Sequence, residues 1–179
     1  MLTDYRIIKL HKNDLACKIP VKYKTPSYFD LQINRDGGGD AFKLIKKDFE
    51  KLTEKRYTIN LFEEAGAMVY GVENENEVIG FIEMIQQKWI RRLRILNIYV
   101  KSKYRSHHIG SLLLEFAESR AAHLHCRAVV LDTESCNYNA IRFYQKHGFQ
   151  ITGFDTLCYT NNDVALHEFR IDLAKQIYS

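Results

Sequence analysis

Short apolar blocks separated by polar turns make up most of the chain from about residue 65 onward. Blocks 67–72 and 78–85 flank the polar turn 73–77, a pattern that predicts two strands of an antiparallel hairpin. Block 93–100 predicts the next strand, and the short block 128–131 predicts a buried one. This half of the chain therefore reads as a sheet with helices inserted between its strands.

Between and after these strands, apolar residues recur at helical spacing. A helix from Ser111 to about His123 is predicted to bury one apolar face, formed by Leu113, Phe116, Ala117, Ala121 and Leu124. A second helix is predicted from Asn137 to Gly148, where glycine suits the left-handed position that ends a helix. Segments 149–154 and 165–173 predict the last strands.

The first sixty residues carry a different pattern. Tyr5 to Leu10 predicts an edge strand, whereas prolines interrupt the region 12–34 and favour an irregular path. The glycine run 36–40 predicts a flexible joint that ends in a helix N-cap, Asp40. A helix is expected next, because a set of apolar side chains recurs at spacings of three and four: Phe42, Ile45, Phe49 and Leu52.

Strand 93–100, the turn that follows, the helix 111–123 and strand 128–131 form a strand-helix-strand unit. Such a unit places its two strands parallel and the turn at their carboxyl ends, where open sheets bind ligands. The turn itself is basic, running from Lys103 to Ser111 with one glycine, Gly110. Free backbone N–H groups at a helix N-terminus together with cationic side chains suit a pyrophosphate.

Composition narrows the setting. A chain of 179 residues, 46% of them hydrophobic, fits one ordinary core, so a single domain over 1–179 is predicted. The charged N-terminus and the absence of a long apolar run predict a cytoplasmic protein without a signal peptide or membrane span. Four scattered cysteines favour reduced thiols over disulfides. The net charge of +4 suits an anionic cofactor as well as nucleic acid.

The basic turn and the segment Asn137 to Phe149 together resemble the acetyl-coenzyme A site of the GNAT superfamily of N-acetyltransferases. The second segment matches the family pattern without a gap, in its Asn, Ala, Phe-Tyr and Gly-Phe positions. In the turn, Arg105 and Gly110 match, whereas His108 replaces a glycine. A side chain at position 108 is expected to require a negative φ, pointing away from the phosphates or donating to them.

The resemblance implies an α/β (α+β) fold with a mixed, mostly antiparallel sheet of six to seven strands, a central parallel splay and about four flanking helices. It covers residues 65–171 as the coenzyme-binding core and leaves 1–64 as a variable acceptor-side segment. It also allows a homodimer that pairs through the last strands. The coenzyme contacts that it implies are Ile98, Tyr99, Val100, Arg105, Ser106, His107, His108, Ile109, Gly110, Ser111, Asn137 and Tyr144.

Acetyl transfer to an amine needs a base or a water path and an acid, because the ammonium must lose a proton and the thiolate must gain one. The resemblance places the hydroxyl of Tyr144 near the coenzyme sulfur as the acid; the alternative is a core tyrosine beside Phe143. A backbone N–H near Tyr99 would hold the oxyanion.

The base is less clearly marked, because Leu96 and Asn97 occupy the place where many relatives carry a carboxylate. Glu83 interrupts an apolar strand face and is one candidate, unless it is an edge charge that reaches solvent. Water relayed through Asn97 is a second option. Glu134 is a third, although its position favours a cap of the following turn.

Two other clusters have ordinary explanations. The histidines 107 and 108, and the tract His123 to Cys126, lack partner ligands at a recognisable spacing, so no metal site is predicted. The basic run 88–94 could track RNA, but a solvated hairpin connection with one packed tryptophan is favoured.

Three functions therefore stay open, in this order: an acetyl-coenzyme A-dependent N-acetyltransferase acting on a small amine, a non-catalytic sensor of the coenzyme, and a nucleic-acid-binding protein. The intact Asn137–Phe149 motif favours the first. Segment 155–161 is similar to the streptothricin acetyltransferases, which modify the β-lysine amine of an antibiotic, so antibiotic resistance is one role that the resemblance implies. Peptide N-termini and polyamines remain alternative acceptors.

Overall fold

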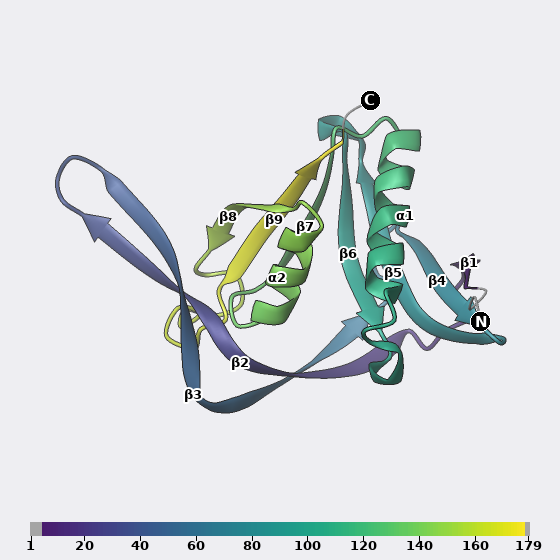
Figure 1. Ribbon diagram of the computed structural model, residues 1–179. Coiled ribbons are helices and arrows are strands. Elements are labelled where there is room, and N and C mark those ends of the chain that lie inside the picture. Colours follow the sequence, from purple (N-terminus) through teal and green to yellow (C-terminus); the bar gives the residue numbers. More distant parts are fainter. Residues whose placement is uncertain (1–4, 178–179) are drawn as a thin grey trace. The chain divides into compact units, whose positions relative to one another are not determined.

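The computed structural model describes residues 5–177 (Figure 1). The strands and helices follow the order β1 (Arg6–Leu10), β2 (Lys18–Arg35), β3 (Asp40–Asn60), β4 (Met68–Asn74), β5 (Glu77–Gln87), the 3-10 turn η1 (Lys88–Ile90), β6 (Arg92–Val100), the 3-10 turn η2 (Ser102–Tyr104), α1 (Ile109–His123), β7 (Ala128–Glu134), α2 (Tyr138–Lys146), β8 (Gln150–Asp155) and β9 (Arg170–Gln176). Seven strands form a mixed sheet in the order β1-β4-β5-β6-β7-β9-β8, and β2 pairs with β3. The predicted strand number is confirmed, whereas the expected four helices are wrong, since the described residues form two α-helices.

The chain divides into two compact units. The first comprises the described residues up to Val21, together with Thr58–Leu131 and those from Ala174 onward; the second comprises Lys22–Tyr57 and Asp132–Leu173. None of the helices in the described part of the chain is long and apolar enough to cross a membrane.

The first unit is built on antiparallel strands β1, β4, β5 and β6. Among the strands of residues 5–177, β1 pairs with β4 and lies at the end of the sheet order, which confirms the predicted edge strand. Strands β4 and β5 form the predicted hairpin, with Met68 opposite Met84 and Asn74 opposite Glu77. Phe81 belongs to a cluster of buried apolar side chains, whose other members are Leu10, Val21, Ile59, Leu61 and Val69.

Helix α1 contributes its apolar face to the same unit. Leu113, Leu114, Ala117 and Ala121 are fully buried, as expected of a helix laid on a sheet. Phe116 and Leu124 are only half-buried.

The second unit contains the long β2–β3 ribbon, and here two predictions are wrong. The region 12–34 is not irregular, because most of it is β2, and the segment after Asp40 is a strand rather than a helix (Figure 1). Ile45 and Phe49 are half-buried. Their spacing of four residues fits a strand as well as a helix, because every second side chain of a strand lies on the same face. Phe42 and Leu52, which only the helix pattern would bury, are 51% and 60% exposed.

Alternation along β2 also shows why its prolines are tolerated. Val21, Thr25 and Ser27 are buried, whereas Pro20 and Pro26 lie at exposed positions of the opposite parity. The glycine run does connect β2 to β3, with positive φ values of 79° at Gly37 and 154° at Gly39. The predicted helix N-cap at Asp40 is wrong, because Asp40 is the first residue of β3.

Helix α2 and strands β8 and β9 complete the second unit. Helix α2 ends before Gly148, whose φ of 85° confirms the predicted left-handed position. Strand β9 begins at Arg170, later than predicted. The preceding loop is closed by Asp163, whose carboxylate accepts the backbone N–H groups of Tyr159 and Thr160 at 2.8 and 2.6 Å.

Candidate functional site

In the first unit, the turn that leads into α1 is tied to the β4–β5 hairpin by one carboxylate. Glu77 accepts hydrogen bonds from Lys101 at 2.9 Å, from Lys103 at 3.0 Å and from the hydroxyl of Tyr104 at 3.0 Å. These donors lower the pKa of Glu77 from its ordinary value to about 2. Glu77 thus anchors the turn to the hairpin. Its carboxylate is the anion with which both lysines are paired.

The next residues of the turn lie toward solvent. Arg105 is exposed, and its Nε donates to the carbonyl oxygen of Val100 at 3.3 Å. His107 is also exposed, and its Nδ1 lies 3.0 Å from the carbonyl oxygen of Arg105. The predicted coenzyme residues Val100, Arg105 and His107 are therefore linked to one another.

The backbone at His108 corrects the sequence expectation. Its φ is 61° and its ψ is 9°, so it adopts a left-handed conformation, and not the expected negative φ. Ser106 has a φ of 66° and is also left-handed. A non-glycine residue in this region costs about 1–2 kcal/mol. Two such residues in one turn are a feature that functional sites often retain.

His108 is the N-cap residue of α1, and its side chain caps no backbone N–H. No acidic residue lies in the first turn of this helix. The N–H groups at the start of α1 and the positive end of the helix dipole therefore keep their capacity for an anion. The predicted residues at this end differ in burial: Ile109 is buried, while Gly110 and Ser111 are half-buried.

Gly80 in β5 allows the start of α1 to lie this close to the sheet. A Cβ at Gly80 would lie 2.9 Å from the carbonyl oxygen of Tyr99 and 3.1 Å from Cγ2 of Ile109. Both distances are shorter than ordinary contacts, so only glycine fits without displacing its neighbours.

The two residues proposed for proton removal, Glu83 and Asn97, face each other across β5 and β6. Nδ2 of Asn97 donates to one oxygen of Glu83 at 2.7 Å, and the backbone N–H of Phe62 donates to the other at 2.8 Å. The side chain is buried, with 1% exposure, so the alternative of an edge charge in solvent is wrong. A buried carboxylate needs hydrogen-bond donors, and the side chain of Asn97 and the backbone of Phe62 supply them to Glu83.

Strand β6 also meets β7, and their parallel pairing runs from Arg92 opposite Ala128 to Arg94 opposite Val130. Strand β6 continues to Val100, and Ile98, Tyr99 and Val100 pair on their other side with β5. The described ladder between β6 and β7 thus ends before Ile98 and Val100, near which the family resemblance implies a splay.

In the second unit, Tyr144 lies on α2 and is 7% exposed. Burial raises the pKa of its phenol well above the usual range, and Tyr57 and Asp132 act in the same direction. The phenol is therefore a proton donor at neutral pH. Asn137, the other predicted residue of this unit, donates from Nδ2 to Oγ1 of Thr133 at 3.2 Å.

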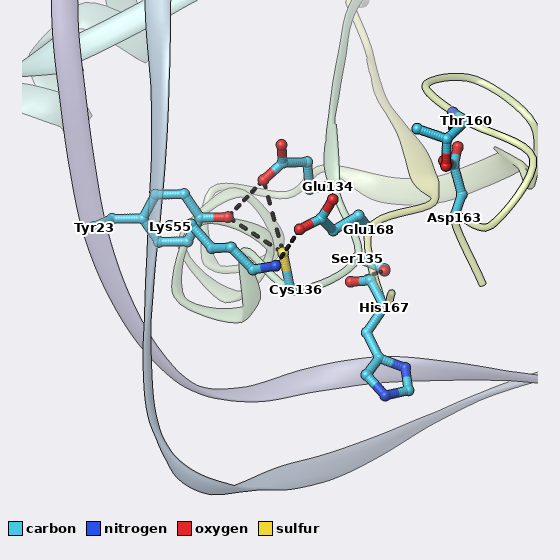
Figure 2. A network of polar contacts seen from close by, with 9 residues as sticks. All are labelled: Tyr23, Lys55, Glu134, Ser135, Cys136, Thr160, Asp163, His167 and Glu168. Carbon is cyan, nitrogen blue, oxygen red and sulfur yellow. Dashed lines mark hydrogen bonds and ion pairs between the residues drawn. The ribbon is translucent and has the colours of Figure 1, made fainter. Parts of the chain in front are cut away.

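A polar network in the second unit was not predicted. Figure 2 shows Tyr23 of β2, Lys55 of β3, Glu134 at the end of β7, Cys136 just after that strand, and Glu168 close together. The hydroxyl of Tyr23 donates to Oε2 of Glu134 at 2.6 Å, and Lys55 forms an ion pair with Glu168. The network joins segments that are far apart in the sequence. For the ribbon that carries Tyr23 and Lys55, the sequence pattern predicted an irregular region and a helix. Glu134 was singled out in the sequence as a candidate base, whereas no local signal could have found its partners in the network.

Two further expectations concern the surface. No group of three or more His, Cys, Asp or Glu side chains that could hold a metal ion occurs in residues 5–177. The tryptophan of the basic run 88–94 is not packed as expected, because Trp89 is 85% exposed.

Comparison with known proteins adds to these features. A model described as the acetyltransferase (GNAT) family matches residues 39–149. Streptothricin acetyltransferase A of Bacillus subtilis (strain 168) is 31% identical over 128 residues, which cover 69% of this chain and 73% of that protein.

Solved structures share the fold over nearly the whole chain. Nourseothricin acetyltransferase matches with a TM-score of 0.77 at 22% identity, covering 98% of this chain and 100% of that one. A putative streptothricin acetyltransferase from Bacillus anthracis str. Ames, in complex with acetyl coenzyme A, matches with a TM-score of 0.77 at 23% identity, covering 98% and 99%.

Proposed function

Because this chain belongs to the GNAT family of acetyl-coenzyme A-dependent N-acetyltransferases, we propose that it acetylates a primary amine of a small molecule, with an aminated antibiotic of the streptothricin type as the acceptor. The observation that carries this proposal is the 31% identity to streptothricin acetyltransferase A over 69% of the chain. The acetyl group would pass directly from coenzyme to amine in a ternary complex.

The start of α1 supports the proposed coenzyme site. Its uncapped N–H groups, the left-handed residues 106 and 108 and the exposed Arg105 suit the pyrophosphate of the coenzyme. Backbone groups of β6 near Ile98 and Val100 would pair with the amide groups of pantetheine, and a backbone N–H near Tyr99 would hold the oxyanion.

The proposed chemistry removes two protons from the acceptor nitrogen and adds one to the departing sulfur. The acceptor ammonium, with an ordinary pKa of about 10, loses one proton to Glu83 directly or through water held by Asn97. The free amine attacks the thioester carbonyl and an N–C bond forms; the nitrogen then loses its second proton to solvent, and the C–S bond breaks. Tyr144 donates its proton to the departing thiolate, which leaves as coenzyme A. The buried, protonated phenol of Tyr144 supports this role.

Replacement of Tyr144 by Phe tests the proposal. The variant keeps the ring but loses the proton donor, so kcat for acetyl transfer to streptothricin is expected to fall about 100-fold or more. Its affinity for acetyl-coenzyme A is expected to change less than about threefold, because the phenol acts on the thiolate that forms during the reaction. Thiol release measures the rate, and isothermal titration measures the affinity.

Tyr138→Phe is the matched control, because Tyr138 lies on the same helix and its ring packs against Phe29 at a centroid distance of 5.5 Å. It should keep near wild-type turnover. Equal turnover of Tyr144→Phe and wild type would remove Tyr144 from the acid role. Tight coenzyme binding by the wild type without transfer to any amine would favour the sensor, and no coenzyme binding would end the enzyme proposal.

A further inference from the structure

Glu134 is half-buried, and only one oxygen of its carboxylate takes part in the network. Its Oε2 accepts the hydrogen bond of Tyr23 at 2.6 Å and lies 3.7 Å from Sγ of Cys136. Among the described residues no hydrogen bond reaches the second oxygen, Oε1, and it points away from Tyr23 and Cys136 in Figure 2. Glu134 is thus held in place through one oxygen while the other is open to a ligand.

The neighbours of Glu134 that donate to it are neutral. Burial raises the pKa of Tyr23 far above its usual range, and Cys136 and Glu134 add to that shift. Burial likewise raises the pKa of the fully buried Cys136 thiol to about 12. Both groups therefore stay protonated and can orient the carboxylate without cancelling its charge.

The one cation in the network is already paired. Nζ of Lys55 forms an ion pair with Glu168, and both side chains are largely shielded from solvent, with 21% and 30% exposure. Two carboxylates and one ammonium leave the five residues Tyr23, Lys55, Glu134, Cys136 and Glu168 with one negative charge in excess. A partly desolvated carboxylate with an open oxygen attracts a cationic group more strongly than an exposed one does.

The position of Glu134 relates it to the proposed reaction centre within the same unit. Asp132 and Glu134 are two residues apart on β7, so their side chains leave the same face of the strand, about 6–7 Å from each other. Asp132 is near enough to Tyr144 to raise the pKa of its phenol. A cationic group bound at Glu134 would therefore lie about 6–7 Å along β7 from an amine beside Asp132, and a short diamine can span such a distance.

We propose that Glu134, positioned by Tyr23, binds a second cationic group of the acceptor, so that the enzyme selects amines that carry another positive charge several ångströms from the amine to be acetylated. This inference rests on the proposed function and makes it narrower. Glu134 acts here as a specificity determinant, and no proton transfer is assigned to it.

The test compares two acceptors with the same five-carbon chain, 1,5-diaminopentane and 1-aminopentane, at pH 8. The wild type should favour the diamine in kcat/KM. Glu134→Gln removes the charge but keeps the shape, so kcat/KM for the diamine should fall about 10- to 100-fold, the range for a hydrogen bond to a charged group. Values for 1-aminopentane and the KM for acetyl-coenzyme A should stay within about twofold of wild type, since neither depends on this charge.

Two further variants complete the comparison. Tyr23→Phe keeps the ring and loses the donor, so it should weaken selection of the diamine less than Glu134→Gln does, and it keeps the test valid if the latter folds poorly. Glu54→Gln is the control for charge, because Glu54 pairs with Arg56 on the same ribbon and outside the network. It should leave the preference unchanged.

Titration of both amines in the presence of coenzyme A separates this inference from the proposed function. Equal losses for diamine and monoamine in Glu134→Gln, or no preference for the diamine in the wild type, would overturn the inference while leaving an acetyltransferase. Binding of the diamine that depends on Glu134, without acetylation of any amine, would uphold the inference and end the proposed function. Absence of diamine binding to the wild type would refute the inference directly.

Discussion

At the scale of single residues, Glu77 shows how the turn before α1 is held. It is the common acceptor for Lys101, Lys103 and Tyr104, and these hydrogen bonds lower its pKa from 4.5 to about 2. Because the folded-state pKa lies below the unfolded one, the stabilisation is complete above about pH 5 and is lost as pH falls toward 2. The Glu77 side chain is 40% exposed, so salt should weaken the effect.

We therefore expect Glu77→Gln to lower the Tm at neutral pH, with a difference from wild type that shrinks steadily between about pH 4.5 and pH 2. Differential scanning fluorimetry across this range measures both proteins. Glu75→Gln, in the same hairpin turn, changes the same charge and should show little difference at any pH. A gap between wild type and Glu77→Gln that stays constant from pH 6 to pH 3 would contradict this explanation.

Single residues also show what the sequence could and could not reveal about the site. Strand alternation was enough to identify Glu83 as an intruder on an apolar face, and its cross-strand neighbour Asn97 followed from the expected position of the base. Their mutual hydrogen bond depends on the register of β5 and β6, which a bulge between Glu83 and Met84 shifts. The left-handed His108 was not predicted, because backbone strain at a non-glycine residue leaves no mark on the hydrophobic pattern.

At the scale of elements, the contact of α1 with the sheet depends on the missing side chain of Gly80. We expect Gly80→Ala to lower the free energy of unfolding by about 1–3 kcal/mol, because the new methyl group would press on the carbonyl of Tyr99 and on Ile109. Affinity for acetyl-coenzyme A should fall as well, since the start of α1 would have to shift. Denaturant unfolding and isothermal titration measure the two effects.

Gly153→Ala is the matched control in β8. A Cβ there would meet Asp172 at ordinary contact distances, 3.4 Å from Oδ2 and 4.0 Å from Cβ, so the stability change should stay within about 0.5 kcal/mol. Similar small effects of both substitutions would show that the start of α1 tolerates the displacement and that Gly80 does not fix its position.

The elements differ in how well their patterns predicted them. Strands β4 to β7 and helices α1 and α2 were recognised within a few residues, because each buries one consistent set of apolar positions. The β2–β3 ribbon was not recognised. One face of its strands is only partly buried, and lysines and prolines occupy the other face. Ile45 and Phe49 satisfied a helical period by coincidence, and packing rather than propensity decides such cases.

At the scale of the whole molecule, the two units share their strands rather than a linker. The boundaries between them fall after Val21, Tyr57, Leu131 and Leu173, and each of these positions lies inside a strand, β2, β3, β7 or β9. A strand that loses its backbone hydrogen bonds in one unit exposes unpaired groups at the edge of the other, which is costly. The division into units is therefore not expected to appear as two independent folding domains.

We expect the protein to unfold in one cooperative transition, with equal calorimetric and van't Hoff enthalpies. Substitutions in either core sharpen the test: Leu113→Ala in the first unit and Ile171→Ala in the second each remove a fully buried side chain and should cost about 2–5 kcal/mol. In a cooperative molecule, each variant lowers the temperature of the whole transition. A variant that melts in two steps, one of them at the wild-type temperature, would show instead that the units unfold separately and that the shared strands do not couple them.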